Sequence, residues 1–328
     1  EEAMKQSGIK IEPERTGIVM GTAMAGIATI AYTQEALTGA SHKKVGPRFI
    51  PKILGNIAAA NIAIDYNIQG PSFTVSTACS SGGDAINTAC MCMQSGKADI
   101  MLAVGAESVL CPLVIYSLAN AKALSRRNDS PSTASRPFDV TRDGFVIGEG
   151  GGALVLETEE HALARGAKIY AEIRGCGNTD DAYHVTAPHP EGRGAIACMK
   201  QAIAEAGINP SDIGYINAHG TATNKGDTVE TSSIKKVFGN TLPYVSSTKG
   251  ATGHMMGAGG ITETITCVKA IETGTVPPTI NLNEVDPECA GIDFVANTAK
   301  KAEINFAMSN AFGFGGQNSS IIVGKYGK

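Results

Sequence analysis

Segments typical of buried strands alternate with segments of helical periodicity along this chain, and this alternation constrains the fold more than any other feature. Strands that alternate with helices predict an α/β fold with largely parallel sheets. The pattern begins again near Lys168, so two similar halves are expected. The first half is predicted to have strands at 16–22, 72–78 and 99–108, helices at 49–66 and 82–96, and a strand followed by a short helix at 151–167.

The second half begins the alternation of strands and helices again. No low-complexity linker separates the halves, so we expect one compact body with a first half at 1–164 and a second at 165–328. Its predicted elements are strands at 168–179 and 213–223, helices at 195–207 and 226–239, a strand, turn and long helix at 243–274, and a closing turn and strand at 308–325.

Composition narrows the class of protein. The 328 residues carry a net charge of -4, which gives no basic surface for nucleic acid. No apolar run approaches the length of a membrane span, so no membrane partner is expected. The eight cysteines form no C-x-x-C pair and no zinc-like cluster, which indicates reduced thiols and a cytoplasmic protein.

One cysteine has an unusual setting. Cys79 lies in "VSTACSSGGDAIN", among small residues, where a predicted strand ends and a predicted helix begins. The unpaired N–H groups of a helix start favour an anion, so we expect a stabilised thiolate that acts as a nucleophile. A packing role is the alternative, and it suits Cys90 and Cys92 within the following helix better.

Two histidines lie in turns that could face this cysteine. His219 follows a predicted strand in "NAHGTAT", and His254 shares the glycine-rich turn "STKGATGHMMGAGG" with Lys249. Open α/β sheets bind ligands beyond the carboxyl ends of their strands, so these residues are candidates for one cleft. The loop "NAFGFGGQN" adds Gly313 and Gly315, which permit close backbone approach but lack the spacing of a nucleotide site.

Five segments in this order resemble the β-ketoacyl-acyl-carrier-protein synthases, most closely the elongating type II enzymes of fatty-acid synthesis. The segments are "TACSSGGDAI", "RPFDVTRDGFVIGEGGGALVLE", "NAHGTATNKGD", "SSTKGATGHMMGAGG" and "NAFGFGGQN". The resemblance implies the thiolase fold, with two similar α/β halves in a five-layer αβαβα arrangement, usually as a homodimer. Family members begin with a further strand and helices that this sequence lacks, so the N-terminal half is expected to be incomplete.

The resemblance also implies a reaction, the decarboxylative Claisen condensation of malonyl-acyl-carrier protein with an acyl group on Cys79. His219 and His254 would donate hydrogen bonds to the malonyl thioester oxygen. The backbone N–H groups of Cys79 and Phe312 would form the oxyanion hole, and Lys249, paired with Glu230, would organise the site. The matching substrate-binding positions are Thr221, Thr223, Phe145, Met24, Leu118, Gly313 and Gly315.

The partner implied by the resemblance is the acyl carrier protein, in its acyl and malonyl forms. Carrier proteins are acidic, and Lys43, Lys44 and Lys122 match positions that face them. No cofactor is required, but family members often hold a structural monovalent or divalent cation. The residues at the matching positions are Asn217, Glu263, Ser309 and Asn310.

Three alternatives stay open. A stand-alone polyketide ketosynthase would share every catalytic residue. A non-catalytic partner like a chain-length factor would lack the cysteine, which this chain has. A thiolase or type III condensing enzyme acts on coenzyme A thioesters, and the type III enzymes pair the cysteine with one histidine and one asparagine, whereas this chain offers two histidines.

Overall fold

The first of two main sheets is built from the first half of the chain. The computed structural model describes residues 1–39 and 45–328. In this sheet β1 pairs in parallel with both β2 and β3, and β3 pairs antiparallel with β4. The strands, in spatial order, are β2 (Ser72–Val75), β1 (Thr16–Gly21), β3 (Ile100–Glu107) and β4 (Gly150–Glu157).

The second sheet draws its strands from the second half. Its pairs from β11 to β9 are parallel, and β12 pairs antiparallel with both β11 and β5. In spatial order the strands are β5 (Glu172–Asp180), β12 (Gln317–Gly324), β11 (Phe306–Phe312), β6 (Ile213–Asn217), β7 (Tyr244–Ser246) and β9 (Asp293–Phe294). A small separate pair joins β8 (Thr275–Val276) to β10 (Lys300–Lys301).

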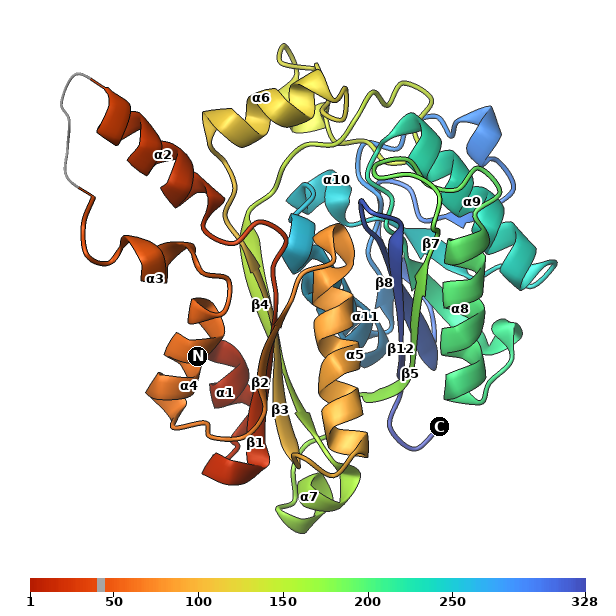
Figure 1. Ribbon diagram of the computed structural model, residues 1–328. Coiled ribbons are helices and arrows are strands. Elements are labelled where there is room, and N and C mark those ends of the chain that lie inside the picture. Colours follow the sequence, from red (N-terminus) through yellow and green to blue (C-terminus); the bar gives the residue numbers. More distant parts are fainter. Residues whose placement is uncertain (40–44) are drawn as a thin grey trace.

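Helices complete five layers, as predicted (Figure 1). Between the sheets lie α5 (Ser81–Gln94) and α11 (Gly259–Thr273), whose apolar faces share one buried cluster with β1, β3, β11 and β12. The outer face of the first sheet packs against α1 (Glu2–Ser7) and α4 (Ile57–Tyr66). The outer face of the second sheet packs against α8 (Arg193–Ala206) and α9 (Asn224–Phe238).

Glycines let the two central helices meet closely at their first turns. A Cβ on Gly82 would lie 2.7 Å from the Ile261 nitrogen, and one on Gly260 would lie 2.4 Å from the Gly83 nitrogen. Neither distance leaves room for a side chain, so the glycines set how closely α5 and α11 approach. This contact fixes the position of the cysteine turn, which directly precedes α5.

Two predicted elements are wrong in detail. The helix expected at 49–66 is two helices, α3 (Phe49–Ile53) and α4, because the chain turns extended at Leu54 before Gly55. The closing turn and strand is a hairpin, since β11 precedes the turn and pairs with β12. The remaining helices are α2 (Ile27–Thr38), α6 (Pro112–Asn120), α7 (Glu159–Ala164) and α10 (Lys249–Thr252).

No helix in the described part of the chain has both the length and the apolar character needed to cross a membrane. All eight cysteines are free thiols, as the sequence predicts.

Candidate active site

The cysteine turn links β2 to α5. Cys79 lies in a 3-10 turn, Ala78–Ser80, and its side chain is almost fully buried. Ala78 before it has a φ of 52°, a conformation that is uncommon for a residue with a Cβ. This bend places Cys79 at the start of α5 and at the pocket wall.

A buried carboxylate braces this turn from within α5. Asp84 accepts hydrogen bonds from the Thr77 hydroxyl at 2.5 Å and the Ser80 hydroxyl at 3.2 Å. Its other oxygen accepts from the Asn178 amide at 2.7 Å, which joins the turn to β5 of the second sheet. The position of Cys79 therefore depends on contacts from both halves.

The expected resting thiolate is not supported. Burial raises the pKa of the Cys79 thiol to about 11, although the Phe314 backbone and the Lys249 charge act in the opposite direction. The cost of removing a thiolate from water therefore exceeds what the helix start provides. At neutral pH the sulfur carries its proton, so it needs a base within reach.

The imidazole of His254 lies within reach of the thiol. Its Nε2 lies 3.1 Å from the Cys79 sulfur. Its backbone is fixed, because its N–H donates to the Val146 carbonyl at 2.8 Å and its carbonyl accepts from the Gly148 N–H at 2.9 Å. The ring edge of Phe145 packs against the imidazole with the centroids 5.2 Å apart.

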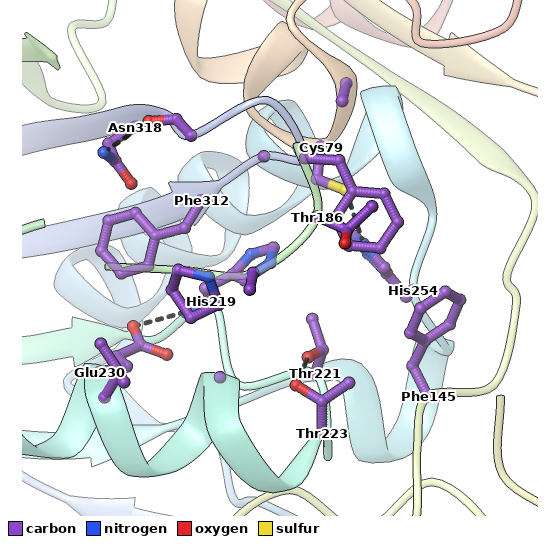
Figure 2. Close-up of a pocket in the computed structure, with 18 of the residues that line it drawn as sticks. Cys79, Phe145, Thr186, His219, Thr221, Thr223, Glu230, His254, Phe312 and Asn318 are labelled. Atoms are coloured by element: carbon purple, nitrogen blue, oxygen red, sulfur yellow. Dashed lines mark hydrogen bonds between the residues drawn. The ribbon is translucent and has the colours of Figure 1, made fainter. Parts of the chain in front are cut away.

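His219 lies beside His254, as Figure 2 shows. The two ring centroids are 5.3 Å apart with the planes nearly perpendicular, and the Phe312 ring is 5.8 Å from His219 on its other side. Glu230 of α9 holds the turn, accepting from the backbone N–H groups of His219 and Gly220 at 2.8 Å each. The predicted convergence of the cysteine and both histidines is thus present.

Burial, with a smaller contribution from the Lys249 charge, keeps both imidazoles neutral. Burial first, and then the Lys249 charge, lower the pKa of His219 and His254 well below 6.5. The predicted pairing of Lys249 with Glu230 is wrong, because its ammonium hydrogen-bonds Glu263 of α11. Glu230 is committed instead to the backbone of the histidine turn.

The pocket has an apolar side and a polar side. Met24, Leu118, Phe145 and Met256 form one apolar cluster with Cys79. Across from it, the Thr221 and Thr223 hydroxyls are 3.1 Å apart. Of the predicted residues, those that line the pocket are Cys79, His219, His254, Phe312, Thr221, Thr223, Phe145, Met24, Leu118 and Gly313.

Glu107 at the end of β3 fixes the apolar wall. It accepts from the backbone N–H groups of Ala23 at 2.6 Å, Met24 at 3.1 Å and Gly257 at 3.1 Å. Since Gly257 follows His254 by three residues, one carboxylate joins the wall at Met24 to the histidine turn.

The remaining predicted residues lie elsewhere. Lys249 is buried behind the pocket, and Gly315 is in the loop between β11 and β12, where its N–H donates to the Val185 carbonyl at 2.8 Å. Lys122 is exposed two residues before Leu124, which bridges to Phe145. Lys43 and Lys44 lie outside the described residues.

Sequence reasoning missed one wall of the pocket. The loop after β5 contributes Asp181, Thr186 and Pro188, and Asn318 of β12 adds to it. The Asn318 amide donates to Asp181 at 3.1 Å, so this wall is tied to the second sheet. Nothing in the polar loop sequence distinguishes it from ordinary surface.

The four positions matched to a cation include two buried oxygens with no hydrogen-bond partner in the described part of the chain. These are Asn217 Oδ1 and Glu263 Oε2. Asn310 uses its carbonyl oxygen to accept from Ser320 at 2.8 Å. Two unpaired oxygen acceptors fit a hard cation, which binds oxygen ligands.

Known proteins share both sequence and structure with this chain. The family model described as beta-ketoacyl synthase, N-terminal domain, matches residues 1–162, and that of the C-terminal domain matches 170–283. The 3-oxoacyl-[acyl-carrier-protein] synthase 2 of Rhizobium meliloti (strain 1021) is 44% identical, over 99% of this chain and 78% of the relative. The same-named protein of Coxiella burnetii (strain RSA 493 / Nine Mile phase I) is also 44% identical, over 99% and 79%.

Solved structures agree with this similarity. One is the structure of a type II PKS acyl-carrier protein in complex with its ketosynthase bound to the hexaketide. A chain of that complex matches with a TM-score of 0.93 and 34% sequence identity, over 98% of this chain and 81% of its own length. A beta-ketoacyl synthase from Burkholderia phymatum STM815 has a TM-score of 0.88 and 35% identity, over 95% and 75%.

Proposed function

Because this chain belongs to the β-ketoacyl synthase family, we propose that it elongates acyl chains by decarboxylative condensation with malonyl-acyl-carrier protein. The observation that carries the proposal is the grouping of Cys79, His254 and His219, with 3.1 Å between His254 Nε2 and the Cys79 sulfur. An acceptor for the thiol proton and two neutral donors are present in one pocket.

The first stage transfers the acyl group to Cys79. The sulfur attacks the carbonyl of an acyl-carrier-protein thioester while its proton passes to His254 Nε2. The bond to the carrier's sulfur breaks, and that sulfur takes the proton. The backbone donor beside the Cys79 sulfur is Phe314 rather than the expected Phe312. The N–H groups of Cys79 and Phe314 therefore stabilise the oxyanion, where loss of one donor typically costs about 3–4 kcal/mol in the barrier.

The second stage releases CO₂ from the malonyl thioester. The electron pair of the broken C–C bond moves into an enolate, whose oxygen accepts hydrogen bonds from the two imidazoles. The enolate carbon then attacks the acyl-Cys79 carbonyl and releases the Cys79 thiolate, which regains a proton. Neutral imidazoles suit this stage because a strong acid would protonate the carbanion.

The described structure leaves the tautomers of both histidines free to serve both stages. The Nδ1 atoms of His219 and His254 are buried and have no hydrogen-bond partner among the described residues. Since a partner at Nδ1 normally selects the tautomer, its absence lets Nε2 accept a proton in the first stage and donate one in the second.

Fatty-acid synthesis is the favoured pathway. The relatives at 44% identity bear the name 3-oxoacyl-[acyl-carrier-protein] synthase 2, whereas the polyketide ketosynthase structure is 34% identical. A chain-length-factor role is disfavoured because Cys79 and both histidines are in place.

Intact-mass measurement tests the proposal. After incubation with acyl-carrier protein, the protein should gain one acyl group, and Cys79→Ala should gain none. His219→Ala and His254→Ala should release little CO₂ from malonyl-carrier protein, with His219→Ala still acylated. An adduct that persists in Cys79→Ala, or normal CO₂ release by both histidine variants, would overturn the mechanism.

We infer that the acyl carrier protein docks on a basic rim beside the pocket. Lys122 and Arg126 are exposed next to the segment that bridges to Phe145. Rim charges chiefly change association rate and salt dependence. The double variant Lys122→Glu, Arg126→Glu should have a higher KM for acyl-carrier protein at low salt. Its turnover of a free pantetheine thioester should not change, because that substrate needs no docking surface. An equal loss of activity on both substrates would contradict docking at this rim.

A second copy of the chain is assigned to the free edge of the first sheet. In the described residues β2 pairs on one side only, and Phe73 on it is 48% exposed. The helix α4, which contacts β2, carries a second exposed apolar residue, Ile64. A free strand edge with apolar neighbours favours pairing with another chain. Light scattering should give a dimer, and Phe73→Glu should give a monomer.

The cation would be held by Asn217 and Glu263, whose unpaired oxygens fit it. It would supply a positive charge next to the buried Glu263. Replacing K⁺ or Mg²⁺ by choline should lower Tm in the wild type and less so in Asn217→Ala. Equal Tm values in both salts would remove the cation from the proposal.

A further inference from the structure

The three reactive side chains also form the donor set of a soft-metal site. One ligand atom from each of Cys79, His219 and His254 lies within 4.8 Å of the other two. One sulfur and two imidazole nitrogens, with a fourth position open, match the ligand count of catalytic zinc sites. Figure 2 shows all three side chains directed into the same pocket.

The spacing requires only side-chain adjustment. Zn–N distances of about 2.0–2.1 Å and a Zn–S distance of about 2.3 Å place tetrahedral ligands about 3.3–3.6 Å apart. His254 Nε2 and the Cys79 sulfur, at 3.1 Å, would move slightly apart. His219, within 4.8 Å of both, would close a remaining gap of at most about 1.2–1.5 Å by rotation.

Metal binding exchanges one proton for the cation. The Cys79 thiol must lose its proton, which a bound cation promotes. The Lys249 charge opposes binding, but its ammonium is already paired with Glu263.

We propose that this pocket binds a thiophilic divalent cation through Cys79, His219 and His254, and that the bound cation blocks acylation. The inference rests on the proposed function, because it treats the metal as a competitor of the acyl group for one sulfur. In the binding step a metal–sulfur bond replaces the S–H bond, and the proton goes to solvent without any change of oxidation state.

Binding should be reversible. Histidines in dedicated zinc sites donate their second nitrogen to a protein partner, and such partners commonly change affinity by about 10–100-fold. Neither Nδ1 has such a partner in the described residues. A chelator should therefore recover the enzyme, and an acylated Cys79 should be protected from the metal.

Cobalt(II) titration of the purified protein, without carrier protein, tests binding directly. The wild type should develop a sulfur-to-cobalt charge-transfer band and the visible bands of tetrahedral cobalt. His219→Ala should bind at least about 10-fold more weakly. Cys79→Ala should lose the sulfur band, and Cys90→Ala, a partly exposed cysteine outside the pocket, should keep it.

Failure of the inference and failure of the proposed function give different results. No sulfur band in the wild type, or an unchanged band in Cys79→Ala, overturns metal binding while acyl transfer stands. Wild type alkylated at Cys79 is a second test, free of any folding defect of the variant, and it must also lose the band. A normal band without an acyl adduct would overturn the proposed function alone.

If the band is present, Zn²⁺ should inhibit condensation, and a chelator should restore it. Enzyme acylated before Zn²⁺ is added should complete its first turnover at the normal rate. Equal inhibition of acylated and free enzyme would overturn the competition between metal and acyl group.

Discussion

Two of the buried carboxylates brace turns at the pocket, and they accept hydrogen bonds mainly from different kinds of donor. In the first half, Asp84 accepts from the hydroxyls of Thr77 and Ser80 around Cys79 and from the Asn178 amide. In the second half, Glu230 accepts from the backbone N–H groups of His219 and Gly220 at 2.8 Å each and, at 3.5 Å, from the Asn310 amide.

This difference in donors decides how each turn responds when its carboxylate loses its charge. A hydroxyl can turn and accept a hydrogen bond, whereas a backbone N–H can only donate. The cysteine turn should therefore tolerate an amide in place of Asp84, and the His219 turn should not tolerate one in place of Glu230. The histidine side depends further on the Lys249–Glu263 pair, which has no counterpart around Cys79 among the residues that the structure describes.

The largest loss of stability is expected on the histidine side, when the charge of Lys249 is removed. Lys249→Met leaves Glu263 buried without its cation, and breaking such a pair typically costs about 3–5 kcal/mol. Denaturant unfolding should show this loss. Lys249→Met with Glu263→Gln should recover most of it, and a double variant no more stable than Lys249→Met would contradict the assignment.

Glu230→Gln is the next test of the comparison. The Gln carbonyl can accept one of the two backbone N–H groups, but its NH₂ would face the other donor. An unsatisfied buried donor costs about 1–3 kcal/mol, and the displaced His219 should slow CO₂ release more than acylation of Cys79. As a control, Glu160→Gln, at an exposed position of α7, should change neither the free energy of unfolding nor CO₂ release. Wild-type CO₂ release by Glu230→Gln would contradict the comparison.

Lowering the pH should change the stability and the activity that depend on Glu230 in opposite directions. Burial raises the pKa of its carboxyl to about 7, from 4.5. The folded state therefore binds this proton more readily than the unfolded state, and Glu230 contributes stability that is lost as pH rises from about 4.5 to about 7. The slope is at most about 1.4 kcal/mol per pH unit for one proton.

Activity should change in the opposite direction, because a protonated Glu230 cannot accept from both N–H groups. CO₂ release should fall as pH drops below about 7, and Glu230→Gln should lack this step. The measurement is the pH profile of CO₂ release in both proteins, alongside their unfolding free energies. A shared acidic step in both would assign it to another group.

The sequence predicts the parts of the site that are local. The strand–turn–helix pattern around Cys79 and the turns at His219 and His254 are each determined by near neighbours, and all three are where the motifs place them. The helix break near Gly55 was missed because Leu54 continues the apolar spacing.

The errors concern contacts between distant residues. The partner of Lys249 depends on how α11 packs beside α10, and Glu263 rather than Glu230 meets its ammonium. The pKa of Cys79 depends on burial by several elements, which no local motif reports. The wall at Thr186 and Asn318 likewise forms only when the β5 loop folds back over the second sheet.

The smallest effect is expected on the cysteine side. In Asp84→Asn the amide NH₂ can donate to the Thr77 hydroxyl, which turns to accept, while the carbonyl oxygen still accepts from Asn178. Since burial already raises the pKa of Asp84, removing its charge also removes a desolvation cost. Acylation of Cys79, measured by intact mass, should slow by less than about threefold, which corresponds to under about 1 kcal/mol in the barrier.

Asp84→Ala is the control variant. It removes every acceptor at once and should slow acylation clearly more, which shows that the assay detects a loosened turn. If Asp84→Asn is as slow as Asp84→Ala, the charge itself holds the nucleophile, and the two carboxylates act alike.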